Sequence, residues 1–214
     1  MGSGPQQGVF MTNVTILGAG NMGSAIANLA LAGGNTVQVL ARDEEKAQVH
    51  AGVTTGVVGD ALIGDLVVLA LPYPAVADVL ATYAGQLDGK ILVDLTNPLD
   101  FATFDDLVVP ADSSAAAEIA TLAPASAVLK AFNTNFAATL ASGTLGGATT
   151  TVLIAGDDSD AKATLVALVE AGGLTAVDAG SLKRARELEA LGFLQLTLAG
   201  GEKISWAGGF NLTK

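Results

Sequence analysis

Residues 14–27 read VTILGAGNMGSAIA, a short apolar run that turns through three glycines into a stretch of helical spacing. Gly18, Gly20 and Gly23 form the pattern G-x-G-x-x-G. In a strand-to-helix turn these glycines permit the tight turn, let the backbone approach a pyrophosphate, and allow the helix to pack on the strand. The helix N-terminus then presents free N–H groups to the anion. The stretch predicts a dinucleotide-binding unit; the alternative is a glycine-rich turn that binds nothing.

The rest of the chain alternates short apolar runs with longer stretches of helical spacing, which is typical of βα units. The runs LVVLAL and TTVLIA are apolar at consecutive positions, as expected for strands covered by helices on both faces. We therefore predict an α/β Rossmann fold: a doubly wound, mostly parallel sheet of about eight strands in a single compact domain with a C-terminal helical closure. The predicted strands are Val14–Leu17, Thr36–Leu40, Gly56–Val58, Leu66–Leu71, Ile91–Asp94, Ala127–Ala131, Thr151–Ala155 and Leu174–Asp178. The predicted helices lie near Asn21–Ala32, Glu44–Ala51, Ala75–Tyr83, Ser114–Leu122, Asp158–Ala171 and Ser181–Ala199.

Composition excludes several classes of function. The 214 residues are 50% hydrophobic, include no cysteine and only one histidine, and carry a net charge of −11. Without cysteine there is no disulfide, thiolate nucleophile or Cys-ligated metal, so we predict no metal site. The acidic balance disfavours nucleic acid and anionic membranes, since both are bound through Lys and Arg. A phosphate-bearing ligand must therefore be held by a few local cations.

Gly, Asp, Thr or Pro interrupts every apolar run before it reaches the roughly 18 residues that a membrane-spanning helix needs. Because half of its residues are hydrophobic, we expect a soluble protein with an unusually apolar surface or with a buried oligomer interface. Residues 1–10 (MGSGPQQGVF) lack the basic start and long apolar stretch of a secretion signal. We interpret them as a tag scar or disordered lead, and we expect a cytoplasmic protein.

The end of the second predicted strand distinguishes NADP from NAD. An acidic residue there binds the ribose 2′-hydroxyl of NAD, whereas a nearby Arg accommodates the NADP phosphate. In VQVLARDEEKA the strand ends at Ala41, which cannot accept a hydrogen bond from ribose; Arg42 follows and Lys46 lies one turn on. No other Lys or Arg precedes Lys90. We predict NADP; the alternative is that Asp43 caps a helix and Lys46 pairs with a surface acid.

Polar and aromatic residues follow the other strand ends, which meet at one edge of a parallel sheet. Tyr73 could pack against the nicotinamide half of the cofactor or seal the core beneath its loop. Asn133 could bond the carboxamide or the partner ring, and Phe132 or Phe136 could stack or belong to the core. The predicted cofactor-binding residues, besides the glycines and Arg42 and Lys46, are Ala19, Asn21, Met22, Ala41, Leu71, Pro72, Tyr73, Asn97, Pro98, Ala131, Asn133 and Thr134.

Two titratable residues are interpreted as non-catalytic. His50 falls at the end of the second predicted helix, at the sheet edge opposite the ligand crevice, so we expect it on the surface. Lys130 ends the sixth predicted strand and is expected to be structural or solvated. No Ser-His-Asp set or Tyr-x-x-x-Lys pair has a suitable placement, and we predict no catalytic side chain.

The ordered series GAGNMG, ARDEEKA, LPYPAV, DLTNP, SSAAAEIA, KAFNT and DAGSLKRARELEALGFLQLTLA resembles the NADPH-dependent coenzyme F420 reductases, also called F420:NADP oxidoreductases. The resemblance covers Asn13 to about Ala199. It implies a compact Rossmann homodimer with nicotinamide near Asn97, Pro98, Asn133 and Thr134. It also implies NADP(H) as cofactor and coenzyme F420 or another flavin as co-substrate.

The resemblance extends to the glycine turn and to Arg42 and Lys46 as phosphate-binding cations. Family members carry a hydroxyl where this chain has Ala41 and a second basic residue where it has Asp43. Both differences should weaken binding of the 2′-phosphate of NADP. The strictness of the NADP preference therefore depends on Arg42 and Lys46.

Chain length favours this family over hydroxyacid dehydrogenases and pyrroline-5-carboxylate reductases, which add a helical domain of about a hundred residues for the substrate. We divide the chain into the lead at 1–10, an NADP-binding Rossmann domain at 11–180, and a C-terminal helix and tail at 181–214. The last segment is expected to close the site and form a dimer surface, because the later turns of ARELEALGFLQLTLA carry no charge.

Hydride transfer between nicotinamide and a deazaflavin needs no acid or base from the protein, since the balancing proton exchanges with solvent at a ring nitrogen. Orientation of the two rings would be the protein's contribution. Two alternatives stay open at this point. The chain could be an NADPH-dependent flavin, quinone or ferric reductase, or a non-enzymatic NADPH-binding redox sensor.

Overall fold

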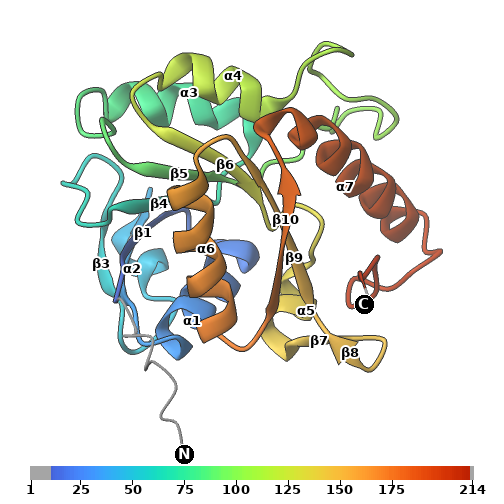
Figure 1. The fold of residues 1–214 in the computed structure, drawn as a ribbon, viewed down its shortest axis with the longest axis horizontal. Helices are drawn as coiled ribbons and strands as arrows, with labels where there is room; N and C mark the ends of the chain where they lie inside the picture. Colours follow the sequence, from blue (N-terminus) through green and yellow to red (C-terminus); the bar gives the residue numbers. More distant parts are fainter. Residues whose placement is uncertain (1–10, 213–214) are drawn as a thin grey trace, which may run out of the picture.

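The computed structural model describes residues 11–212, so the predicted lead at 1–10 and the last two residues of the predicted tail lie outside the described residues. Its centre is an 8-stranded sheet in the order β10-β9-β6-β5-β4-β1-β2-β3 (Figure 1). Every neighbouring pair is parallel except β6 and β9. The strands are β1 Asn13–Leu17, β2 Thr36–Ala41, β3 Thr54–Val57, β4 Leu66–Leu69, β5 Ile91–Asp94, β6 Ala127–Ala131, β9 Thr151–Gly156 and β10 Thr175–Gly180.

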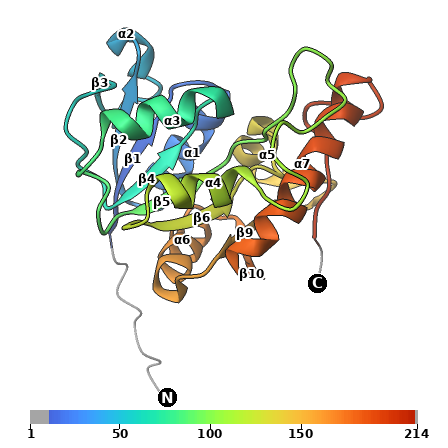
Figure 2. The same cartoon turned by 90° about the horizontal axis from the view of Figure 1, so that it is seen from above.

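Helices cover both faces of this sheet (Figures 1 and 2). On one face α1 and α6 bury Ile26, Leu29, Leu165 and Leu168 against the strands. On the other face α3 and α4 bury residues such as Val76 and Ile119. Two apolar layers explain why the central strands are apolar at consecutive positions. The helices are α1 Asn21–Ala32, α2 Glu44–Ala47, α3 Tyr73–Thr82, α4 Ala115–Leu122, α5 Ala137–Ser142, α6 Ser159–Ala171 and α7 Ala185–Gly200, with a 3₁₀ turn η1 at Leu182–Arg184 before α7.

The predicted doubly wound, mostly parallel sheet is confirmed, with differences at some boundaries. The second helix is a single turn, because the chain leaves the helix at Gln48, and His50 lies beyond it, exposed. The fourth strand stops at Leu69, so Leu71 belongs to the loop before α3. These differences leave the order of elements unchanged.

Two small elements between β6 and β9 are additional to the predicted ones. Helix α5 is a short helix that ends at Gly143 in a left-handed conformation. A hairpin follows, formed by β7 Thr144–Leu145 and β8 Ala148–Thr149. Gly146 and Gly147 have φ of 61° and 84° at its tip, as a two-residue hairpin turn requires. The segment from α5 through this hairpin connects β6 to β9, which pairs antiparallel to β6.

The C-terminal segment folds back onto the start of β9. Residues 201–212, called the tail below, follow α7 and are held by Asn211, whose Oδ1 accepts from the backbone N–H of Thr151 at 3.0 Å. The backbone N–H of Phe210 donates to Gln195 of α7 at 2.9 Å. The tail therefore forms a fixed wall beside α7. Within residues 11–212 no helix combines the length and the apolar character needed to span a membrane.

Candidate functional site

The glycine turn joins β1 to α1, and its three glycines differ in their surroundings. Gly18 has φ of 115°, and a Cβ there would overlap the backbone oxygen of Ala70. A Cβ on Gly23 would overlap the backbone oxygen of Gly18. At Gly20 the same Cβ would meet no atom within 4 Å. Gly20 is also the N-cap of α1 and supplies no side chain, so the first N–H groups of α1 are free for an anion.

A cavity of about 700 Å³ opens beside this turn. Arg42 and Lys46 are exposed at its lining, and none of the ion pairs formed by residues 11–212 includes either of them. Asp43 caps α2 by accepting from the N–H of Glu45 at 3.2 Å, so the cap coexists with two free cations. The cavity therefore offers positive charge and open helix N–H groups together. Its lining comprises Gly18, Ala19, Gly20, Leu40, Ala41, Arg42, Lys46, Val58, Ala70, Leu71, Pro72, Ala75 and Val79.

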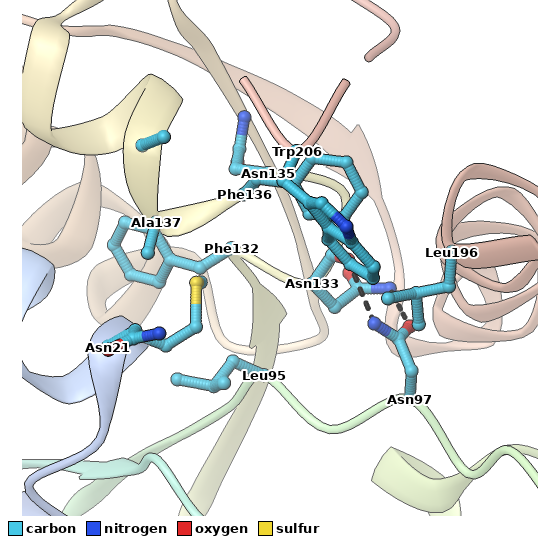
Figure 3. Close-up of a pocket in the computed structure, with 12 residues that line it drawn as sticks. Asn21, Leu95, Asn97, Phe132, Asn133, Asn135, Phe136, Ala137, Leu196 and Trp206 are labelled. Carbon is cyan, nitrogen blue, oxygen red and sulfur yellow. Dashed lines mark hydrogen bonds between the residues drawn. The ribbon is translucent and has the colours of Figure 1, made fainter. Parts of the chain in front are cut away.

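A second cavity of about 360 Å³ is lined at the start of α1 by Asn21 and Met22 (Figure 3). Phe136 and Trp206 form one wall, with ring centroids 5.1 Å apart and planes inclined by 53°. None of its lining residues is charged. A flat uncharged ring system suits such walls. The lining residues are Asn21, Met22, Leu95, Asn97, Phe132, Asn133, Asn135, Phe136, Ala137, Ala138, Leu196 and Trp206.

Two asparagines from neighbouring strand ends join at the floor of this second cavity (Figure 3). The Nδ2 group of Asn97 donates to the backbone oxygen of Asn133 at 3.0 Å, and Nδ2 of Asn133 donates to Oδ1 of Asn97 at 3.0 Å. Gly192 of α7 lies against the pair, and a Cβ there would overlap Oδ1 of Asn97. Helix α7 can therefore approach the two asparagines only because position 192 is glycine.

A buried ion cluster lies beneath the same loops. Nζ of Lys130 contacts Oδ2 of Asp94 at 2.7 Å and Oε1 of Glu189 at 2.9 Å. Lys130 also donates to the backbone oxygen of Thr96 at 2.5 Å. Burial raises the pKa of Glu189, and Lys130 opposes that shift. Because Glu189 also accepts from the N–H of Ala115 at 2.9 Å, the cluster ties α7 to α4 and the sheet. Lys130 is thus a buried structural lysine.

Tyr73 begins α3 and turns toward α4. Its hydroxyl donates to Glu118 in a short hydrogen bond. Burial, and secondarily Glu118, raises the pKa of this phenol above its ordinary range. Tyr73 is not among the residues that line either cavity, although its neighbour Pro72 lines the first.

The two cavities bring most of the predicted binding residues together. The first contains Gly18, Ala19, Gly20, Ala41, Arg42, Lys46, Leu71 and Pro72, and the second contains Asn21, Met22, Asn97 and Asn133. Gly23, Pro98, Ala131 and Thr134 are buried behind these linings. Pro98 and Thr134 therefore shape the loops whose neighbouring asparagines line the second cavity.

Sequence reasoning missed six residues of the second cavity: Leu95, Asn135, Ala137, Ala138, Leu196 and Trp206. Leu95 and Asn135 stand beside predicted positions, so proximity along the chain could have indicated them. Trp206 is the only tryptophan of the chain and lies in the tail. No local pattern places it opposite Phe136, about seventy residues earlier.

Residues 11–212 contain no group of three or more His, Asp or Glu side chains that could hold a metal ion. Three buried polar atoms in the same part of the chain lack a hydrogen-bond partner: Oγ1 of Thr96, Oδ1 of Asn133 and Oδ1 of Asn135. Two of these three belong to residues that line the second cavity.

The chain is similar to several known oxidoreductases. Residues 13–98 match the family described as NADP oxidoreductase coenzyme F420-dependent. The F420-dependent NADP reductase of Methanocaldococcus jannaschii is 29% identical over 81% of this chain and 86% of its own length. The metalloreductase STEAP3 of Rattus norvegicus is 33% identical over 83% of this chain, which spans only 36% of that protein. A solved structure of a candidate F420-dependent NADP reductase from Arthrobacter sp. FB24 is 27% identical, covers 95% of this chain and 100% of its own, and has a TM-score of 0.83.

Proposed function

We propose that this chain is an NADP-dependent oxidoreductase related to the coenzyme F420-dependent NADP reductases, and that it transfers hydride between NADP(H) and a flat, flavin-like acceptor, with the deazaflavin coenzyme F420 as the leading candidate. The observation that carries the proposal is the pair of cavities that flank the N-terminus of α1. One has unpaired cations and free helix N–H groups, and the other has aromatic and amide walls without charge.

The first cavity would hold the phosphates and the adenosine half of the dinucleotide. The open space at Gly20 lets the backbone come close to the pyrophosphate, and Arg42 and Lys46 are placed for the 2′-phosphate. Arg42 can present a planar fork to that phosphate, whereas Lys46 can act as a mobile point charge. NADPH in this orientation would direct its nicotinamide toward Met22 and the second cavity.

The second cavity would align the nicotinamide with the acceptor. When bound, NADPH supplies the hydride, and the acceptor ring takes it together with one proton from solvent. Phe136, Trp206 and Leu196 would hold the acceptor ring flat, and the linked Asn97 and Asn133 would fix the floor beneath it. Alignment of reacting atoms at about 3 to 3.5 Å is the main requirement for such a transfer.

A ferric or free-flavin reductase is the second candidate, because STEAP3 is described as a metalloreductase. The same cavity would then take a flavin that passes electrons onward. We also propose that the protein works in the cytoplasm as a homodimer without nucleic-acid or membrane partners.

The test measures the oxidation of NADPH by each acceptor, and stopped-flow absorbance at the nicotinamide band monitors the reaction. We expect turnover with coenzyme F420, or with FMN or riboflavin, and none with pyruvate, succinic semialdehyde or pyrroline-5-carboxylate. The carboxylate of a small acid would have no positively charged partner, because no cation lines the second cavity. Rapid turnover of these acids or the imine without any response to flavins would contradict the proposal. Tight NADPH binding without turnover of any acceptor would instead favour a redox sensor.

A further inference from the structure

Trp206 lines the second cavity from a segment that makes no hydrogen bond to its surroundings. Its ring packs against Phe136, with the two centroids 5.1 Å apart (Figure 3). Within residues 11–212, the hydrogen bonds of residues 205–209 connect only members of this segment, at Ser205. The backbone that carries Trp206 is therefore positioned by packing and by the residues on either side of the segment.

The first anchor of the tail joins it to α7. Gln195 is only 2% exposed, and its Oε1 accepts from the backbone N–H of Phe210 at 2.9 Å. Gly209 has φ of 137°, a conformation that side chains other than glycine rarely adopt. A Cβ on Gly209 would lie 2.6 Å from the same Oε1. The chain can thus lie against Gln195 because position 209 is glycine.

The second anchor joins the end of the tail to β8 and β9. Oδ1 of Asn211 accepts from the backbone N–H of Thr151 at 3.0 Å, and its Nδ2 donates to the backbone oxygen of Thr149 at 3.0 Å. The hydroxyl of Thr151 donates to the backbone oxygen of Leu212 at 3.1 Å. The amide of Asn211 uses both of its ends, and a carboxylate of the same size could not donate the second bond.

We propose that Gln195, Gly209 and Asn211 are positioning residues for the redox acceptor. They line neither cavity, and they hold Trp206 where its ring can pack on the acceptor. The inference rests on the function proposed above and assigns part of acceptor binding to residues that do not touch the acceptor. Trp206 is 54% exposed, so the cavity does not enclose it. Loss of an anchor should move Trp206 and weaken ring binding, while NADP⁺ affinity stays unchanged.

Trp206 reports its own position, because it is the single tryptophan of the chain. Quenching of its fluorescence by acrylamide would be compared between the unaltered protein and Asn211→Ala. We expect the quenching constant to rise by up to about twofold, because release of the tail takes a ring that is 54% exposed toward full exposure. An unchanged quenching constant would overturn the inference, since Asn211 would then not hold Trp206.

Acceptor binding can be measured without turnover, from the fluorescence anisotropy of riboflavin or 5-deazariboflavin added to the NADP⁺ complex. We expect Asn211→Ala and Trp206→Ala each to weaken ring binding about three- to tenfold, which corresponds to one aromatic stacking contact. The double variant should bind no more than about twofold more weakly than Trp206→Ala alone, because Asn211 acts through Trp206.

Two further variants complete the experiment. Gly209→Ala disturbs the first anchor and should weaken ring binding in the same way as Asn211→Ala. Asn28→Ala is the matched control, since Asn28 is an exposed asparagine on α1 that lines neither cavity, and it should leave ring binding unchanged. Urea unfolding and NADP⁺ affinity of each variant establish that it is folded and that its dinucleotide site is intact.

Full additivity of Asn211→Ala and Trp206→Ala would overturn the inference, because Asn211 would then act independently of the ring. An equal loss of NADP⁺ affinity in Asn211→Ala, or the absence of binding of both rings to the unaltered protein, would overturn it as well. The proposed function fails on separate grounds, when no flavin or deazaflavin oxidises NADPH, because ring binding requires no turnover.

Discussion

The three glycines of the turn between β1 and α1 differ in what surrounds them, and a side chain would have a different effect at each. Gly18 and Gly23 face the backbone of neighbouring segments, so they are needed for folding. Gly20 faces open space at the edge of the larger cavity. The same motif therefore contains positions that serve packing and one position that serves the ligand.

We expect Gly20→Val to abolish NADPH binding while the chain remains folded, because the new side chain would project into space proposed for the pyrophosphate. Gly23→Val should instead destabilise the protein by more than about 2 kcal/mol, since its Cβ would overlap backbone. Calorimetric titration and urea unfolding measure the two effects. Undiminished NADPH affinity in a folded Gly20→Val variant would refute the assignment.

Charge reversal at Arg42 tests the cofactor preference. We expect Arg42→Glu to raise the KM for NADPH roughly ten- to hundredfold, as the loss of a hydrogen bond between charged groups implies, with a much smaller change for NADH. Lys183→Glu is a control, because Lys183 is an exposed cation that lines neither of the two cavities. Equal effects of Arg42→Glu on both cofactors would exclude Arg42 as the phosphate partner.

At the scale of elements, the cluster around Lys130 connects parts of the chain that are far apart in sequence. It joins β5, β6 and α7 through Asp94, Lys130 and Glu189, and it reaches α4 through the N–H groups that Glu189 caps. These elements carry the loops with Asn97 and Asn133. The cluster thus sets the position of α7 over the floor of the second cavity.

Removal of the central cation should destabilise the fold strongly. We expect Lys130→Met to reduce the free energy of unfolding by about 3–5 kcal/mol, because two buried carboxylates lose their partner. Lys162→Met removes a comparable but partly exposed pair with Asp178 and should cost less than about 1 kcal/mol. Urea denaturation at neutral pH compares the two variants, and similar losses in both would disprove the structural role of the cluster.

For the molecule as a whole, several apolar residues of α7, the tail and a neighbouring loop stay exposed. Helix α7 buries Leu188, Gly192 and Ala199 within the chain, whereas Leu194 on another face stays 48% exposed. The loop at 98–113 lies beside α7, where Phe104 faces Gly200 (Figures 1 and 2). Exposed apolar residues around this region are Phe101, Val108, Leu194, Trp206, Phe210 and Leu212. Large apolar side chains exposed on neighbouring segments are typical of interfaces between subunits.

We therefore expect light scattering at micromolar concentration to give about twice the chain mass of 21.3 kDa. Leu194→Glu should shift the protein toward monomer, because a charge in an apolar interface remains without a partner. Leu122→Glu is the control, since Leu122 is 56% exposed on α4 and lies outside this cluster. A monomer in the unaltered protein, or an equal response to both variants, would contradict the expected interface.

The order of the main-sheet strands along the chain and the role of the glycine turn could be predicted because they depend on neighbouring residues. Apolar runs such as residues 66–71 and the spacing of three glycines are local patterns, and right-handed crossovers leave few ways to assemble them. Arg42 and Lys46 could be selected for the same reason, since one short segment carries both. The sequence by itself thus determined the Rossmann fold and the candidate residues for phosphate binding.

Only the tertiary structure decided how the second cavity is built. Trp206 meets Phe136, Glu189 meets Lys130 and Gly192 meets Asn97 across long separations in sequence, and no periodic pattern encodes those pairs. The contact between Tyr73 and Glu118 could not be predicted from the sequence either, because it depends on how α3 and α4 pack. Side chains brought together by packing of distant elements are fixed by burial and steric fit of the whole core, which a local stretch of sequence does not contain.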